Sequence, residues 1–202
     1  QCLNSFPLAN PSETCLMSPD GTHLVCGNKN ESNEGSTFRI YDINKGTCLY
    51  TFKDEPFCVT VIRFSPDGTF LATAHEFSED VSVDSETAHL KNAFIRIWNI
   101  KTGTLYKELS DTWSYRVWSL AFHPNGRWLA SGTESKMSLL WDIETGVCIQ
   151  PIPQTDSVES LTFSPDGTLL ISGANSKIHI WDIDLQPSLQ LLTGHSNPIY
   201  SL

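Results

Sequence analysis

The sequence lacks the features that mark several broad classes of protein. Its 13 Lys and Arg residues are outnumbered by 23 Asp and Glu residues, which gives a formal net charge of -10, and the basic residues form no run. Binding to nucleic acid needs clustered cations to meet the phosphates, so we expect no nucleic-acid partner. No apolar stretch reaches the roughly 18 residues of a membrane-spanning helix. A charged-then-apolar leader is also missing, so we expect no membrane partner and a cytoplasmic location.

Cysteine is present, but not in the arrangements that bind zinc or staple a small secreted fold. There is no CxxC pair. Five of the six cysteines fall in the first 58 residues; the full set is Cys2, Cys15, Cys26, Cys48, Cys58 and Cys148. This distribution predicts reduced, mostly buried thiols and no compact disulfide framework.

Catalytic signatures are missing as well. The sequence contains no G-x-S-x-G turn for a nucleophilic serine, no H-E-x-x-H zinc motif and no glycine-rich phosphate loop. We therefore predict that the chain is not an enzyme and uses no cofactor.

An internal repeat is present. Four turn anchors share the pattern Ser/His-Pro-Asp/Asn-Gly; they are Ser18-Pro19-Asp20-Gly21, Ser65-Pro66-Asp67-Gly68, His123-Pro124-Asn125-Gly126 and Ser164-Pro165-Asp166-Gly167. A second anchor pairs an aromatic residue with Asp or Asn and is followed by Ile; it occurs at Tyr41-Asp42, Trp98-Asn99, Trp141-Asp142 and Trp181-Asp182. Self-similarity of this kind indicates a repeat architecture.

The turn anchors predict β-hairpins. Proline presets φ at the second corner, and glycine can adopt the left-handed conformation at the end of the turn. We expect that conformation at Gly21, Gly68, Gly126 and Gly167. The flanking segments read as short strands, four in each repeat, and no window shows a sustained helical period.

The repeat length and the strand composition favour stacked blades. The third and fourth turn anchors, at 123 and 164, are 41 residues apart, which suits a four-stranded propeller blade. Ile95, Ile97 and Trp98 cannot all point the same way, because alternate residues of a strand face opposite sides. A sheet packed between two others needs apolar residues on both faces.

These residues resemble the WD-repeat family of β-propellers, most clearly in Trp141-Asp142-Ile143 and Trp181-Asp182-Ile183. The resemblance implies a non-catalytic platform for protein partners. It also implies that a hydroxyl on the second strand pairs with the aromatic residue of the third. These pairs are Thr73 with Trp98, Ser131 with Trp141 and Ser172 with Trp181, whereas Cys26 and Tyr41 take the two places in the first blade.

We expect one all-β domain over residues 1–202, built as an incomplete ring. The expected parts are a blade stub at 1–10, blades at about 11–54, 55–111, 112–154 and 155–193, and a further stub at 194–202. Because the stubs cannot link into a closed ring, the sequence predicts an internal fragment of a longer protein. Isolated, such an arc is expected to self-associate through its exposed blade faces.

The residues where the inner strands begin form the candidate partner surface. Trp118, Glu159 and Tyr200 hold equivalent positions, five residues before a turn anchor or its counterpart. Arg116 stands two residues before Trp118, and Trp113 lies in the preceding loop. Trp, Tyr and Arg are enriched at interface hot spots.

Other interpretations remain open at this point. The long insertion at 75–91 begins at His75 and holds Glu76, Glu79 and Asp80, so it could bind a divalent cation or a partner. The chain could also be the propeller domain of a larger peptidase-like hydrolase or of a signalling enzyme. The preferred interpretation is a scaffold that binds other proteins or peptides.

Overall fold

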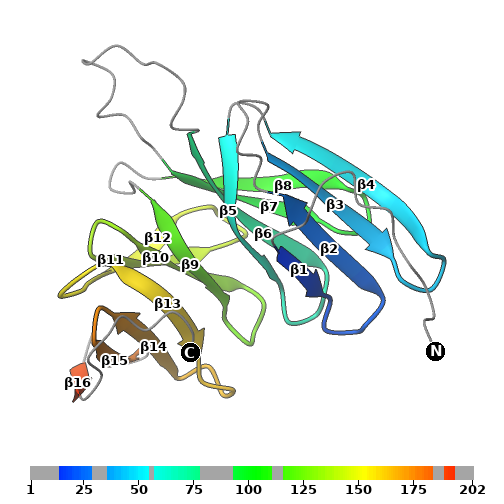
Figure 1. The fold of residues 1–202 in the computed structure, drawn as a ribbon. Coiled ribbons are helices and arrows are strands. Elements are labelled where there is room, and N and C mark those ends of the chain that lie inside the picture. Colours follow the sequence, from blue (N-terminus) through cyan, green and yellow to red (C-terminus); the bar gives the residue numbers. More distant parts are fainter. Residues whose placement is uncertain are drawn as a thin grey trace, which may run out of the picture.

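The computed structural model describes residues 14–28, 36–54, 57–77, 93–110, 116–183 and 189–193. Within these ranges every regular element is a β-strand. The strands form four antiparallel sheets of four strands each (Figure 1). The prediction of an all-β fold made of four-stranded blades is confirmed.

Each sheet is a run of four consecutive strands, here called a blade. The first blade contains β1 (Thr14–Met17), β2 (His23–Asn28), β3 (Ser36–Asp42) and β4 (Thr47–Asp54), and the second contains β5 (Phe57–Phe64), β6 (Phe70–Phe77), β7 (Phe94–Asn99) and β8 (Thr104–Leu109). The third contains β9 (Val117–Phe122), β10 (Trp128–Thr133), β11 (Met137–Asp142) and β12 (Cys148–Pro153), and the fourth contains β13 (Val158–Phe163), β14 (Leu169–Ala174), β15 (Lys177–Asp182) and β16 (Leu189–Thr193).

The turn anchors connect the first and second strands of each blade. Their glycines have φ values of +71, +71, +72 and +79° in chain order. In the second blade the Ser65 hydroxyl donates to Asp67 Oδ1 at 2.6 Å and accepts from the amide of Phe70 at 2.8 Å. In the first blade, a hydrogen bond from the Ser18 hydroxyl and smaller contributions from hydrogen bonds of Thr22 lower the pKa of Asp20 to about 2. Side-chain hydrogen bonds therefore stabilise these turns in addition to the backbone hydrogen bonds.

The blades pack face to face because their strands are apolar on both sides. In β11, Leu139 and Trp141 join the cluster shared with the second blade, whereas Leu140 joins the cluster shared with the fourth. In β7, Ile97 faces the third blade while the Trp98 ring lies against Phe38 of the first, at 5.7 Å between centroids. Three separate cores thus lie between the four sheets.

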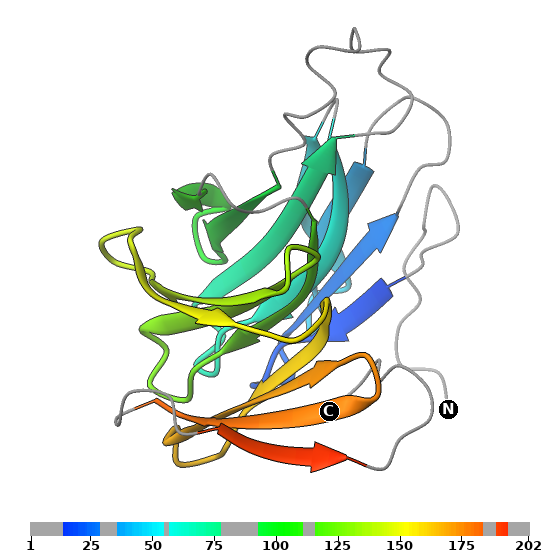
Figure 2. The same cartoon turned by 90° about the vertical axis from the view of Figure 1, so that its left-hand side faces the viewer.

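The sheets follow one another in a fan (Figure 2). The first strands of the second, third and fourth blades, β5, β9 and β13, lie side by side, and we call them the inner strands. The fourth strands lie on the outside. The described blades form an arc that does not close into a ring.

Two expectations from the sequence need correction. The long insertion does not begin at His75, because β6 continues to Phe77; His75 is fully buried in the sheet. Residues 78–92 lie outside the described part of the chain, as do both stubs. The cysteines are also less buried than expected: Cys26 and Cys58 are buried, but Cys15 and Cys48 are exposed.

Candidate functional site

Each inner strand carries a β-bulge where it enters the sheet. In the second blade Val59 pairs with His75 and Val61 with Ala74, which leaves Thr60 as the extra residue. The same irregularity leaves out Trp118 in the third blade and Glu159 in the fourth. A bulge bends the strand and redirects a side chain. We call Thr60, Trp118 and Glu159 the bulge residues.

Hydrogen bonds join the inner strands at this level. The Thr60 hydroxyl donates to the carbonyl oxygen of Val117 at 3.2 Å. The Ser119 hydroxyl donates to the carbonyl oxygen of Val158 at 3.3 Å. Neighbouring blades are therefore fixed to one another beside the bulges, and the three bulge residues follow one edge of the arc.

At the centre of this edge, an aromatic ring contacts a cation, and the cation forms an ion pair with an anion. The guanidinium carbon of Arg116 lies 4.2 Å from the centroid of the Trp118 ring. Arg116 Nε lies 2.9 Å from Glu76 Oε2, which belongs to β6 of the second blade; the contact is an ion pair without the geometry of a hydrogen bond. The arrangement thus joins two blades. Of the acidic residues assigned to the insertion, Glu76 is instead part of this site.

This arrangement leaves the Trp118 ring accessible to a binding partner while restricting the motion of the ring. The side chain is 39% exposed. The Arg116 side chain is 27% exposed, so the ion pair and the cation–π contact are partly shielded from water and stronger than on an open surface. A preorganised ring loses little conformational entropy on binding, which favours recognition.

Glu159 adds a carboxylate in an unfavourable setting on the next inner strand. Its Oε2 atom is buried and has no hydrogen-bond partner in the described part of the chain. Burial, and then the negative charge of Asp156, raise the pKa of Glu159 above its usual value. A buried acceptor without a donor is costly, so the ionised carboxylate of Glu159 destabilises the folded state.

Replacing Glu159 with Gln should stabilise the protein at neutral pH. Because the pKa of Glu159 is raised in the folded state, the native carboxyl keeps its proton to a higher pH than the carboxyl of the unfolded chain. The free energy of unfolding therefore falls as the pH rises from the unfolded-state pKa to the folded-state pKa. We expect Glu159→Gln to raise the thermal-unfolding midpoint by about 2 °C at pH 7, and the gain to vanish below about pH 4. The measurement is a thermal scan at both pH values.

The matched control is Glu144→Gln, which removes the same charge from an exposed turn. It should leave the midpoint within about 1 °C of the wild type. A gain for Glu159→Gln that persists at pH 4 would show that burial of the charged form is not the cause.

The structure places three of the five residues proposed for partner binding. Arg116, Trp118 and Glu159 lie on the same edge, on or directly before two neighbouring inner strands. Trp113 and Tyr200 lie outside the described residues, so their part in this surface stays a prediction.

Beneath this edge, buried hydroxyls hold the aromatic residues of the third strands. The Nε1 atoms of Trp98, Trp141 and Trp181 donate to Thr73, Ser131 and Ser172 at 2.8, 2.9 and 3.0 Å. In the first blade, Cys26 and Tyr41 occupy the corresponding buried positions. These side chains belong to the second and third strands of each blade, so they stabilise the sheet that contains the inner strand.

Two further residues extend this network, and sequence reasoning missed both. His75 Nε2 lies 2.6 Å from the Thr73 hydroxyl. Gln154, in the connection between the third and fourth blades, accepts from Ser172 at 3.1 Å and donates to Ser138 at 2.9 Å. A lone polar residue in a connection has no sequence pattern that marks it.

The opposite ends of the inner strands surround a hollow of about 460 Å³. Its walls are polar and apolar in similar measure and include the prolines of three turn anchors, and Arg63 is the one charged residue among the described residues that line it. Arg63 Nη1 donates to the neighbouring carbonyl oxygen of Ile62 at 2.8 Å, and burial lowers the pKa of the guanidinium.

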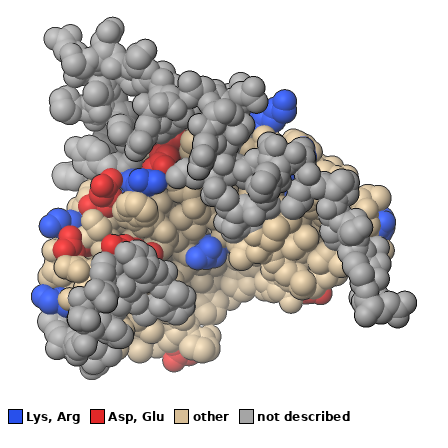
Figure 3. Space-filling view, in the orientation of Figure 1, with Lys and Arg blue, Asp and Glu red and all other residues tan. Residues whose placement is uncertain are grey.

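Other kinds of site find no support in the described residues. They contain no group of three or more His, Cys, Asp or Glu side chains that could hold a metal ion; most of the 75–91 insertion, where the sequence suggested one, lies outside them. None of their segments is a helix suited to crossing a membrane. On the face shown in Figure 3, described charges of both signs are interspersed and form no continuous basic area.

Comparison with known proteins gives a consistent result. The family model described as "WD domain, G-beta repeat" matches residues 46–85, 103–142 and 146–182, more than half of the chain. The matches begin at or near the glycine that follows a third strand, and two of the three end at the aromatic-Asp pair of the next blade.

Several curated proteins are similar to the chain. WD repeat and SOCS box-containing protein 1 of Takifugu rubripes is 30% identical over 109 residues, covering 52% of this chain and 22% of that protein. WD repeat-containing protein SL1-17 of Schistosoma mansoni is 29% identical over 147 residues, covering 59% and 48%. A Lissencephaly-1 homolog of Caenorhabditis briggsae is 29% identical over 120 residues, covering 44% and 30%. The chain thus spans less than half of the length of these relatives.

Proposed function

Because this chain belongs to the WD-repeat family, whose members are generally protein-interaction scaffolds, we propose that it binds other proteins or peptides at the edge formed by the bulge residues. In this proposal the chain performs no catalysis, binds no cofactor and acts in the cytoplasm. The sheets supply rigidity, and the inner-strand edge supplies recognition.

One observation carries the proposal: Trp118 is a large exposed ring in a fixed orientation. It stands at a bulge, its position is set by Arg116, and Arg116 is in turn held by Glu76. Binding energy at interfaces concentrates in a few Trp, Tyr and Arg residues. The Arg116–Trp118 pair combines two of these residue types.

The partner chemistry follows from the neighbouring charges. Trp118 offers an exposed apolar ring, and the acidic Glu159 on the next inner strand is partly exposed. A peptide with an apolar side chain beside a Lys or Arg would complement both.

Replacing Trp118 or Arg116 with Ala should weaken partner binding by about 1–3 kcal/mol, or about 5- to 150-fold in affinity, without unfolding the blade. The chain would be used as bait in cell extract, and the captured proteins quantified by mass spectrometry. The dissociation constant of a recovered partner would then be measured for each variant.

The matched control is Tyr106→Ala on the outer strand β8, because Tyr106 is an aromatic residue with similar exposure, 44%. Partners should be retained by Tyr106→Ala and lost by Trp118→Ala and Arg116→Ala. Equal affinities for all variants, with unfolding midpoints unchanged, would overturn the proposal.

A further inference from the structure

Two cysteines face each other across the first hairpin. Cys15 on β1 is the direct register partner of Cys26 on β2. Their Sγ atoms lie 2.7 Å apart. A disulfide bond measures about 2.05 Å, so bond formation needs the sulfurs to move by less than about 1 Å.

This cysteine pair is a departure from the repeat at both of its positions. In the other blades the register partners at this place are an apolar residue and a hydroxyl residue; they are Ile62 with Thr73, Leu120 with Ser131, and Leu161 with Ser172. Only in the first blade are both members cysteine. The two substitutions therefore create one juxtaposition rather than two unrelated small residues.

The two thiols differ in accessibility in a way that suits stepwise oxidation. Cys15 is exposed, so a small oxidant in solution can reach its sulfur. Cys26 is buried, with 5% of its surface exposed, directly behind it. An accessible thiol next to a second thiol is the usual arrangement of a redox-sensitive pair.

We propose that Cys15 and Cys26 form a site of two-electron oxidation by a peroxide. The Cys15 sulfur attacks a peroxide oxygen, the O–O bond breaks, and a sulfenic acid forms with release of water. The Cys26 sulfur then attacks the Cys15 sulfur, the S–O bond breaks, and a second water leaves. Two thiols and one hydrogen peroxide thus give one disulfide and two waters.

The disulfide would fasten the innermost strand of the first blade. β1 has only four residues and pairs with β2 alone, so few hydrogen bonds hold it. A covalent link to β2 reduces the conformational entropy of the unfolded chain and thereby stabilises the folded blade. The first blade is therefore expected to be more stable in the oxidised protein than in the reduced one.

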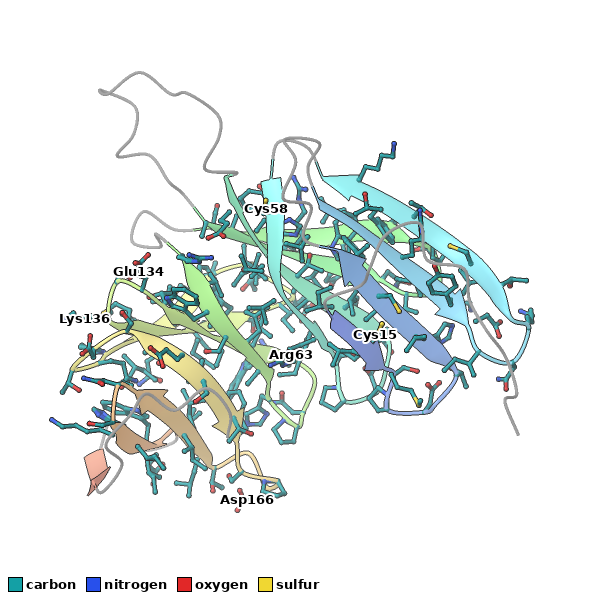
Figure 4. All side chains as sticks on the ribbon, in the orientation of Figure 1. Cys15, Cys58, Arg63, Glu134, Lys136 and Asp166 are labelled. Carbon is teal, nitrogen blue, oxygen red and sulfur yellow. The ribbon has the colours of Figure 1, made fainter. Side chains whose placement is uncertain are left out.

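Cys48 and Cys58 lie in other settings. Cys48 lies on β4, where its thiol donates to the carbonyl oxygen of Tyr50 at 3.4 Å. Cys58 is the second residue of β5 and is well separated from Cys15 (Figure 4). Cys48 is a suitable internal control, since it is exposed like Cys15.

The test treats the native full chain with hydrogen peroxide, blocks remaining thiols with an alkylating agent in denaturant, and maps the peptides. Cleavage after acidic residues cuts at Glu13 and Asp20 and so places Cys2, Cys15 and Cys26 in separate peptides. The linked Cys15–Cys26 peptide should exceed any other pairing about tenfold. The same treatment in denaturant should remove this preference.

Two variants complete the test. Cys26→Ser installs a hydroxyl residue like those of the other blades, so it should fold and lose the peroxide-induced rise in unfolding midpoint, whereas Cys48→Ser should keep it. Overoxidised, unlinked Cys15 in the wild type, or preferential pairing of Cys15 with another cysteine, would overturn the proposal. A peroxide-induced rise that survives in Cys26→Ser would do the same.

Discussion

Replacing Trp141 with Ala should lower the free energy of unfolding by about 4 kcal/mol. The side chain is 2% exposed and lies in the core between the second and third blades. Removing the indole leaves a large cavity there, and it leaves the Ser131 hydroxyl without the N–H that it accepts at 2.9 Å. The cavity and the lost hydrogen bond both destabilise the folded state. Chemical denaturation monitored by circular dichroism would measure the change.

Trp118→Ala serves as the comparison, because it removes the same side chain from an exposed position two strands away in the same blade. It should change the free energy of unfolding by less than about 1 kcal/mol. If the two variants were equally destabilised, the division between supporting and recognising tryptophans would be wrong.

Gly132→Ala should destabilise the protein by about 3 kcal/mol, because a methyl group would separate the third and fourth blades. The added carbon would lie 2.6 Å from Val158 Cγ1 and 2.8 Å from the Val158 carbonyl oxygen, and it would also meet the Ser119 hydroxyl. The Val158 backbone cannot move without disturbing β13. Thermal and chemical unfolding would both register the loss.

Gly27→Ala is the matched control, since Gly27 follows Cys26 just as Gly132 follows Ser131. Among the described residues, its added carbon would meet the Cδ1 end of Ile62, at 3.0 Å, and Phe38 Cβ, at 3.9 Å. A side-chain end can shift, and Ala74 stands naturally at this place in the second blade. We expect a loss below about 1 kcal/mol for Gly27→Ala. Equal losses at both sites would contradict the close approach of the third and fourth blades.

The fold class could be predicted from the sequence because its signals are local and repeated. A turn anchor specifies a hairpin within a few residues, and apolar residues on both faces of a strand require neighbours on both sides. β11 shows this directly, because Leu140 and Trp141 enter different cores. Such information needs no knowledge of distant contacts.

The candidate site could be predicted only in part. Trp118 and Glu159 share a position relative to the turn anchors, and that spacing identified them. The bulges themselves have no residue signature, since Thr60, Trp118 and Glu159 are chemically unlike. The contact between Glu76 and Arg116 was also missed, because it joins different blades and Glu76 read as part of an insertion.

Hydrogen–deuterium exchange of the chain, free and bound to a recovered partner, tests the central claim most directly. Protection on binding should concentrate at the beginnings of the inner strands β9 and β13, around Arg116–Ser119 and Val158–Ser160. The outer strands β8 and β12 should exchange equally in both states. Protection confined to the outer strands, with none at the inner-strand edge, would contradict the account.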